Sequence, residues 1–205
     1  MKASGLQGVE RDVRAVIIGG SAGATAVVRE ILGLLTPAFP VPIAIVQHLH
    51  AEDDGLMVEN LGRATRMPVV EVQDKMPALP GRVHVAPADY HMLVERGGAF
   101  ALSVDEPVMW CRPSIDVFFH SAALVWGAGL LAIVLSGANE DGAAGLLSVK
   151  SRGGQALVQD PATAQFPKMP AAAMALAGLD GGMSPAQIAV LLERLERRGR
   201  RGKNA

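Results

Sequence analysis

Cysteine, aromatic residues and an excess of either charge are all scarce in this sequence. The single cysteine among 205 residues, Cys111, cannot form an internal disulfide, which favours a reducing compartment such as the cytoplasm. Aromatic residues make up only 4%, which is few for a surface on which nucleic-acid bases stack. The 19 Lys and Arg against 20 Asp and Glu give a net charge of −1, so the composition predicts neither a nucleic-acid partner nor attraction to an anionic membrane.

The sequence also lacks a segment that could cross a membrane or direct export. Its longest uncharged apolar run, 122–135, has 14 residues, whereas a membrane-spanning helix needs about 20. Residues 1–14 carry charges throughout and have no apolar centre, unlike an export signal. With 50% hydrophobic and only 19% charged residues, the composition is that of one folded domain, which we place at 13–198 after an extension at 1–12.

Short apolar runs alternate with helical patterns along the chain. Apolar residues on both faces and many β-branched side chains are typical of buried parallel strands, and the alternation predicts an α/β fold: a three-layer α/β/α arrangement with a mainly parallel, doubly wound sheet. The expected strands are 13–18, 42–46 and 130–135, with weaker candidates at 69–72 and 156–158. The expected helices are 25–35, 56–65, 115–125, 143–149 and 170–177.

Two segments depart from this alternation. Short β-type runs at 83–86, 92–95 and 100–104, the last two joined at Gly97-Gly98, predict that 82–104 forms an antiparallel β-hairpin appendage on the sheet. Ser184-Pro185 is typical of a helix start, and we expect a helix from there to about residue 198. The basic tail 199–205 is expected to be disordered.

Three chemically useful side chains each follow an expected strand. Ser21 lies in the run GGSAG (19–23), which fits G-x-S-x-G; His48 follows the second strand; and Asp141 lies in the turn after 130–135. Because ligands of parallel sheets bind beyond the carboxyl ends of the strands, the three can meet at one edge. A histidine can take the proton of a serine, and a carboxylate can fix the histidine tautomer, so nucleophilic catalysis is one interpretation.

Other interpretations of the same residues stay open at this point. A dinucleotide fingerprint would need glycine where Ile18 stands, and no G-K-[ST] follows for a nucleotide-binding P-loop, so no cofactor is expected. His48 and His50 with Asp53 and Asp54 could instead hold the metal of a metal-dependent hydrolase, although no third histidine or cysteine follows at a ligand spacing.

Structural roles also compete for these side chains. Asp141 could simply cap the helix expected from residue 143. Cys111 has no obvious partner and is expected to be inert, and the remaining histidines are expected to be structural: His84, His91 and His120.

Taken in order, these residues resemble the catalytic domain of the CheB-type protein-glutamate methylesterases of bacterial chemotaxis. The similarity covers roughly 13–192 and includes the family's serine turn, its Q-H pair and four further motifs. The matching runs are GGSAGA (19–24), QH (47–48), APADYHM (86–92), RPSID with its later F and S (112–121), LSG and DGAAG (135–145), and MP (169–170). Ala138 stands where the family has methionine, and Cys111 where it has histidine.

The resemblance implies an esterase with Ser21 as nucleophile, His48 as base and Asp141 as the orienting carboxylate. The backbone N–H of Ala22 would help to hold the oxyanion, and Ala138 would form part of the site wall. The implied substrate is a glutamyl methyl ester on the helical cytoplasmic region of a chemoreceptor, with deamidation of glutamines as related chemistry. A docking module of low activity that binds receptors or other signalling proteins is the alternative. The family's receiver domain is not expected, because about a dozen residues precede the first strand.

Overall fold

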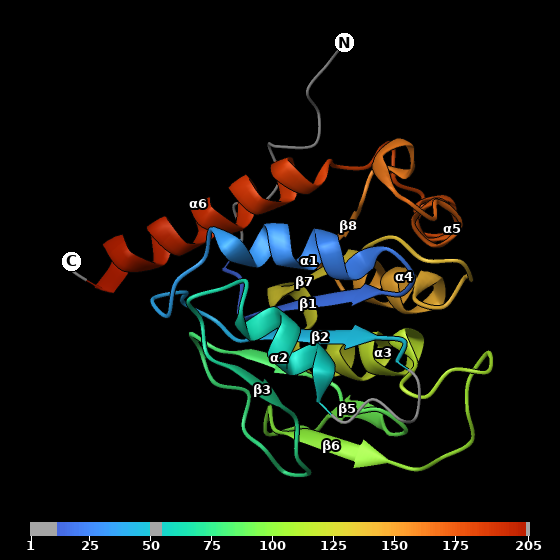
Figure 1. The fold of residues 1–205 in the computed structure, drawn as a ribbon, viewed down its shortest axis with the longest axis horizontal. Helices are drawn as coiled ribbons and strands as arrows, with labels where there is room; N and C mark the ends of the chain where they lie inside the picture. Colours follow the sequence, from blue (N-terminus) through green and yellow to red (C-terminus); the bar gives the residue numbers. More distant parts are fainter. Residues whose placement is uncertain (1–11, 50–54, 204–205) are drawn as a thin grey trace.

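The computed structural model describes residues 12–49 and 55–203, and its centre is a six-stranded parallel sheet (Figure 1). The strands follow the order β3-β4-β2-β1-β7-β8, so β2, β4 and β3 lie on one side of β1 and β7 and β8 on the other, with β4 inserted between β2 and the edge strand β3. Their bounds are β1 Ala15–Gly20, β2 Ile43–Gln47, β3 Val69–Glu71, β4 Val83–Val85, β7 Leu130–Val134 and β8 Gln155–Val158. All residues of β1, β2, β4 and β7 are buried, as expected for strands covered on both faces.

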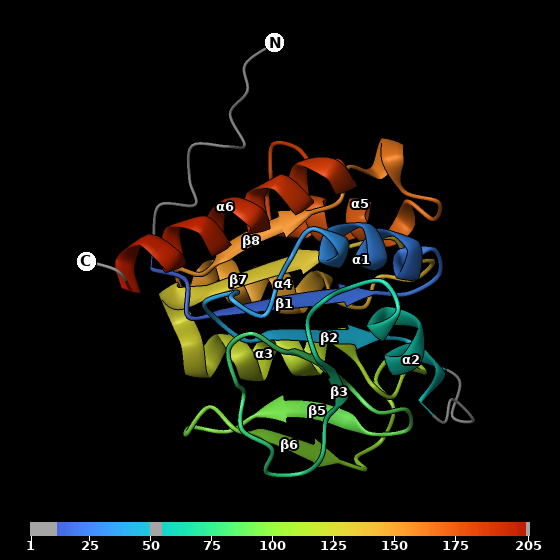
Figure 2. The ribbon, with the colours of Figure 1, turned by 60° about the vertical axis from the view of Figure 1, so that its left-hand side comes forward.

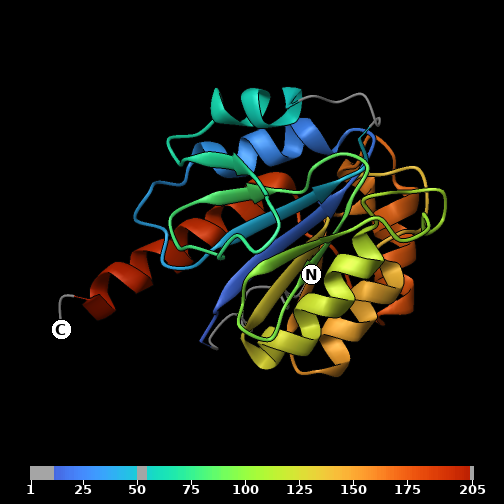
Figure 3. The same cartoon turned by 90° about the horizontal axis from the view of Figure 1, so that it is seen from below.

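Helices cover both faces of this sheet. Residues of α1 (Ala24–Gly33), α2 (Leu56–Gly62) and α6 (Pro185–Lys203) share one apolar core with one face. Residues of α3 (Ile115–Trp126), α4 (Ala143–Ser151) and α5 (Lys168–Leu176) share a second core with the other face. Figure 3 shows the strands running between these two helical layers. The predicted three-layer, doubly wound α/β fold is therefore confirmed.

The expected antiparallel appendage is smaller than the sequence indicated. Among the strands of the described residues, β5 (His91–Val94) and β6 (Phe100–Ser103) are the two that pair antiparallel, as a separate two-stranded sheet beside α3 (Figure 2). The run at 83–86 was wrongly assigned to it, because β4 is an interior strand of the main sheet, between β3 and β2. The polar His84 concealed this, but its ring is buried: Nδ1 donates to the Ile43 carbonyl (3.1 Å), and Nε2 accepts from the Leu79 amide (3.4 Å).

The last helix begins as expected and ends later. Ser184 and Gln187 cap its start reciprocally: the Ser184 hydroxyl accepts from the Gln187 amide, and the Gln187 side chain accepts from the Ser184 amide. The prediction of a disordered segment from 199 is wrong up to Lys203, because α6 continues to that residue. Arg200 there pairs with the buried Glu196, which also accepts from the Thr36 amide at 3.1 Å. Residues 204–205 lie outside the described part of the chain, as do residues 1–11 of the expected extension at 1–12.

Two short 3-10 helices complete the elements, η1 at Gly127–Gly129 and η2 at Pro161–Thr163. None of the helices within 12–49 and 55–203 is long and apolar enough to cross a lipid bilayer.

Candidate active site

The turn after β1 presents Ser21 at the carboxyl edge of the sheet. The backbone amide of Ser21 donates to the carbonyl of Ser136 (2.9 Å), which joins this turn to the turn after β7. Gly23 adopts a positive φ of 78° as it starts α1, a conformation that most side chains avoid. A Cβ at Gly19 would lie 2.4 Å from a methyl of Ile115, so glycine lets α3 approach the end of β1. Local structure therefore accounts for both glycines of the G-x-S-x-G run: Gly23 adopts a positive φ, and Gly19 leaves room for Ile115.

His48 connects the serine to a carboxylate. Its Nδ1 lies 3.1 Å from the Ser21 hydroxyl oxygen, and its Nε2 lies 2.7 Å from Oδ2 of Asp141. A carboxylate only accepts hydrogen bonds, so the ring proton of neutral His48 is on Nε2 and the Nδ1 lone pair faces Ser21. The backbone amide of His48 also donates to the carbonyl of Gly20 (3.2 Å), which fixes the distance between the two turns. All three predicted side chains thus come together in one hydrogen-bonded chain.

Asp141 is fully buried and receives hydrogen bonds from four donors. Besides His48, its oxygens accept from the Ser114 hydroxyl (2.9 Å), the Ile115 amide (2.7 Å) and the Asp116 amide (3.0 Å). Burial alone would raise the pKa of Asp141, but the hydrogen bonds from His48 and from these groups outweigh it and lower the pKa. The carboxylate is therefore charged at neutral pH and can stabilise a protonated His48.

The alternative role of Asp141 as the cap of its own helix is wrong. That helix, α4, begins after Gly142, and the Asp141 oxygens lie instead at the first turn of α3. The first turn of α4 receives a carboxylate from α3: Oδ1 of Asp116 accepts from the amides of Gly142 (2.9 Å) and Gly145 (2.6 Å). The start of α3 is thus capped by Asp141, which precedes α4, and the start of α4 is capped by Asp116 of α3. Burial raises the pKa of Asp116, with the hydrogen bonds from Gly145 and Gly142 opposing it.

Sequence reasoning assigned no role to Asp116. The residue lies within the RPSID run, but nothing in the sequence places residue 116 beside residue 142, since the two are 26 positions apart. The contact arises because α3 and α4 start at the same edge of the sheet and pack on the same face.

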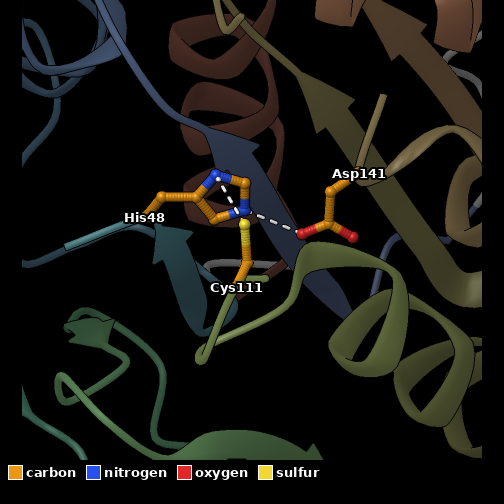
Figure 4. A group of neighbouring side chains, drawn as sticks. All are labelled: His48, Cys111 and Asp141. Carbon is orange, nitrogen blue, oxygen red and sulfur yellow. Dashed lines mark hydrogen bonds and ion pairs between the residues drawn. The ribbon is translucent and has the colours of Figure 1, made fainter. Parts of the chain in front are cut away.

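Cys111 lies inside the site, so the expectation that it has no partner is wrong. Its sulfur is 3.6 Å from Nδ1 of His48, and Asn139 Nδ2 donates to it at 3.4 Å. Figure 4 shows His48, Cys111 and Asp141 pointing toward one another from three different segments. Burial, together with the negative charge of Asp141, raises the pKa of the Cys111 thiol. The sulfur is therefore protonated at neutral pH and is a poor nucleophile in this state.

The remaining histidines make structural contacts, and most of the metal set expected around His48 lies outside the described residues. His91 is buried, with Nε2 donating to the Glu106 carbonyl (3.1 Å) and Nδ1 accepting from the Ser114 amide (3.1 Å). His120 Nδ1 lies 3.1 Å from the Ser148 hydroxyl oxygen. The other members of the proposed His48 metal set lie outside the described residues: His50, Asp53 and Asp54.

The two alanines near the serine differ in their surroundings. The carbonyl of Ala22 accepts from the Ser136 hydroxyl (2.8 Å), while the structure gives the Ala22 amide no acceptor among the described residues. That amide, directly after Ser21, is available to an oxyanion. Ala138 is exposed and lines an open pocket of about 350 Å³. The other residues of this pocket are Phe166, Pro167, Lys168 and Ala171.

A parallel α/β sheet that joins a serine, a histidine and a buried carboxylate at its carboxyl edge has the arrangement found in serine hydrolases. Comparison with known proteins narrows this class. The family model for CheB methylesterase matches residues 16–192. The chain belongs to the CheB methylesterase family.

Individual relatives agree with this assignment. A Leptospira interrogans protein, named as a candidate protein-glutamate methylesterase/protein-glutamine glutaminase, is 41% identical over 89% of this chain and 94% of its own. A Bordetella parapertussis protein-glutamate methylesterase/protein-glutamine glutaminase is 40% identical over 91% of this chain, which spans 54% of that protein. The crystal structure of the Thermotoga maritima CheB methylesterase catalytic domain superposes with a TM-score of 0.84 at 27% identity, covering 90% of this chain and 100% of that one.

Proposed function

We propose that this protein hydrolyses the methyl esters of glutamyl side chains on the cytoplasmic region of a chemoreceptor, releasing methanol. The observation that carries the proposal is the hydrogen-bonded chain Ser21–His48–Asp141 in a member of the CheB methylesterase family. Deamidation of glutamine side chains is the same acyl chemistry with ammonia as the leaving group, in keeping with the names of its relatives. Because the substrate region is cytoplasmic, so is the proposed site of action.

Acylation begins with transfer of the Ser21 proton to Nδ1 of His48, whose lone pair faces the hydroxyl at 3.1 Å. The serine oxygen then forms a bond to the ester carbonyl carbon. The carbonyl oxygen becomes an oxyanion, which the amide of Ala22 is placed to stabilise. Asp141 keeps the other ring proton on Nε2 and offsets the positive charge of the imidazolium. The protonated Nδ1 next gives its proton to the departing methoxide, and methanol leaves.

Deacylation repeats these steps with water in place of the serine. His48 takes a proton from a water molecule, the hydroxide attacks the glutamyl–serine ester, and the proton returns to Ser21 as the ester breaks. The product is a glutamate carboxylate. No metal takes part in these steps, so a strong chelator should not lower the rate, whereas the alternative metal-dependent hydrolase would lose activity.

Methanol release from a radiolabelled, methylated chemoreceptor fragment tests the proposal. The protein should release methanol at a rate proportional to enzyme, and Ser21→Ala should reduce the rate to the background of a no-enzyme control. Equal release by parent and Ser21→Ala would exclude this serine as the nucleophile. Receptor binding without methanol release by the parent would favour the alternative docking module.

A further inference from the structure

We propose that a thiophilic divalent cation such as Zn²⁺ binds between His48 and Cys111 and switches the esterase off. Within the part of the chain that the structure describes, His48, Cys111 and Asp141 are the group whose ligand atoms lie close enough to hold a metal, all within 4.8 Å of one another. Metal binding stands on this geometry alone, whereas inhibition rests on the proposed function.

The spacing of the two nearest ligand atoms fits one metal ion. Zinc binds cysteine sulfur at about 2.3 Å and histidine nitrogen at about 2.0–2.1 Å, so a tetrahedral ion holds the two atoms roughly 3.5 Å apart. Cys111 Sγ and His48 Nδ1 are 3.6 Å apart. Little movement of either side chain is therefore needed to admit the ion.

The second nitrogen of His48 is already arranged as in protein zinc sites. A metal-bound histidine commonly donates its other N–H to a carboxylate, which fixes the tautomer and makes the ligating nitrogen more basic. Asp141 accepts from Nε2 at 2.7 Å, which leaves Nδ1 unprotonated, so its lone pair can bind the ion in place of the Ser21 hydrogen bond. Asp141 thus orients His48 without binding the ion itself. The Ser21 hydroxyl, whose oxygen lies 3.1 Å from Nδ1, or water can complete the coordination of the ion.

The segment that carries Cys111 is held in place by its own contacts. Backbone hydrogen bonds join Val108 and Cys111 in both directions, at 3.1 and 2.9 Å. The next residue, Arg112, donates to Asp89 at 2.6 and 3.0 Å and to the Val104 carbonyl at 2.9 Å. Cys111 is only partly buried and the His48 side chain is 13% exposed, so the pair is not closed off from solvent.

Binding would remove the catalytic base. The thiol of Cys111 loses its proton to solvent as the sulfur–metal bond forms, and the Nδ1 lone pair enters a second bond to the metal. That lone pair is the one that accepts the Ser21 proton in the proposed mechanism, so a metal-bound His48 cannot activate the serine.

Cobalt absorption tests the site without reference to activity. Co²⁺ added to tag-free protein should produce the near-ultraviolet charge-transfer band of a cobalt–thiolate bond, and Zn²⁺ should abolish the band by displacement. Cys111→Ser should eliminate the band and His48→Ala should weaken Co²⁺ binding at least tenfold. His120→Gln, which changes a histidine outside the site, should bind like the parent. Absence of the band in the parent, or equal Co²⁺ affinity in His48→Ala, would overturn the proposal.

Inhibition is measured separately, as methanol release with increasing Zn²⁺. Each protein is compared with its own rate in chelator, and Cys111→Ser should need at least tenfold more Zn²⁺ than the parent for half-inhibition. Equal Zn²⁺ sensitivity in the two would refute inhibition through Cys111. If the parent showed the cobalt band but released no methanol at any Zn²⁺ concentration, the metal site would stand and the proposed esterase would fail.

Discussion

Replacing Asp141 with asparagine tests both the proposed chemistry and the link between the two helices. The carboxylate accepts from four donors: His48, the Ser114 hydroxyl, and the amides of Ile115 and Asp116. An amide side chain has a single oxygen and an NH₂ group that can only donate. In either orientation the NH₂ group of asparagine faces one of the two backbone amides.

The expected loss of stability follows from that unpaired amide. A buried donor without an acceptor costs about 1–3 kcal/mol, and in a domain of this size 1 kcal/mol lowers Tm by about 2–4 °C. Asp141→Asn should therefore melt about 2–12 °C below the parent. The matched control is Asp160→Asn: Asp160 accepts from the Ala162 amide at the start of η2, and asparagine caps equally well there, so Tm should hardly change.

The expected loss of activity is larger than this loss of stability. If the NH₂ group faces His48, the ring takes the wrong tautomer, with its proton toward Ser21; if it faces away, the imidazolium still loses its counter-charge. The reduction in kcat should be about 10²–10⁴-fold, the upper figure being that of the corresponding change in a serine protease. The assay is methanol release well below the Tm of the variant, with folding checked by circular dichroism. A folded variant with parental kcat would show that Asp141 only caps α3.

Three further predictions concern separate parts of the molecule. Ser21→Ala and His48→Ala should each abolish nearly all methanol release and the double variant should lose little more, because the two act as a unit; additive losses would contradict this. Burial holds the pKa of His84 below its ordinary 6.5, so as the pH falls through 6.5 the unfolded chain takes up a proton that the folded chain resists, and stability declines. His84→Gln should therefore show a smaller difference in Tm between about pH 7.5 and about pH 5.5 than the parent, and an equal difference would assign the acid sensitivity to other groups. Glu196→Ala, which removes the acceptor of the Thr36 amide, should cost about 1–3 kcal/mol without changing kcat; a lower kcat would couple α6 to the site.

Local sequence patterns were sufficient to predict most of the fold, because the strands are almost entirely apolar and the helices bury apolar residues against them. The runs that became β1, β2 and β7 are apolar on both faces, and the helices between them contribute apolar residues to the two cores. The errors came where one polar residue or a charged end hid a tertiary contact. His84 made β4 look like a hairpin strand, and the basic end of α6 concealed its pairing through Glu196.

The sequence by itself determined that Ser21, His48 and Asp141 would lie at one edge of the sheet, because in a parallel sheet every strand presents its carboxyl end to the same side. Which atoms meet at that edge was decided only by the tertiary structure. The start of α3 lies against the turn after β7, so Asp141 caps α3 rather than its own helix. In the same way, Asp116 accepts hydrogen bonds from the backbone amides at the start of α4. The same packing brings Cys111 to His48 across 63 positions of sequence. Contacts of this kind depend on how layers pack against one another, and no local period or spacing in the chain encodes them.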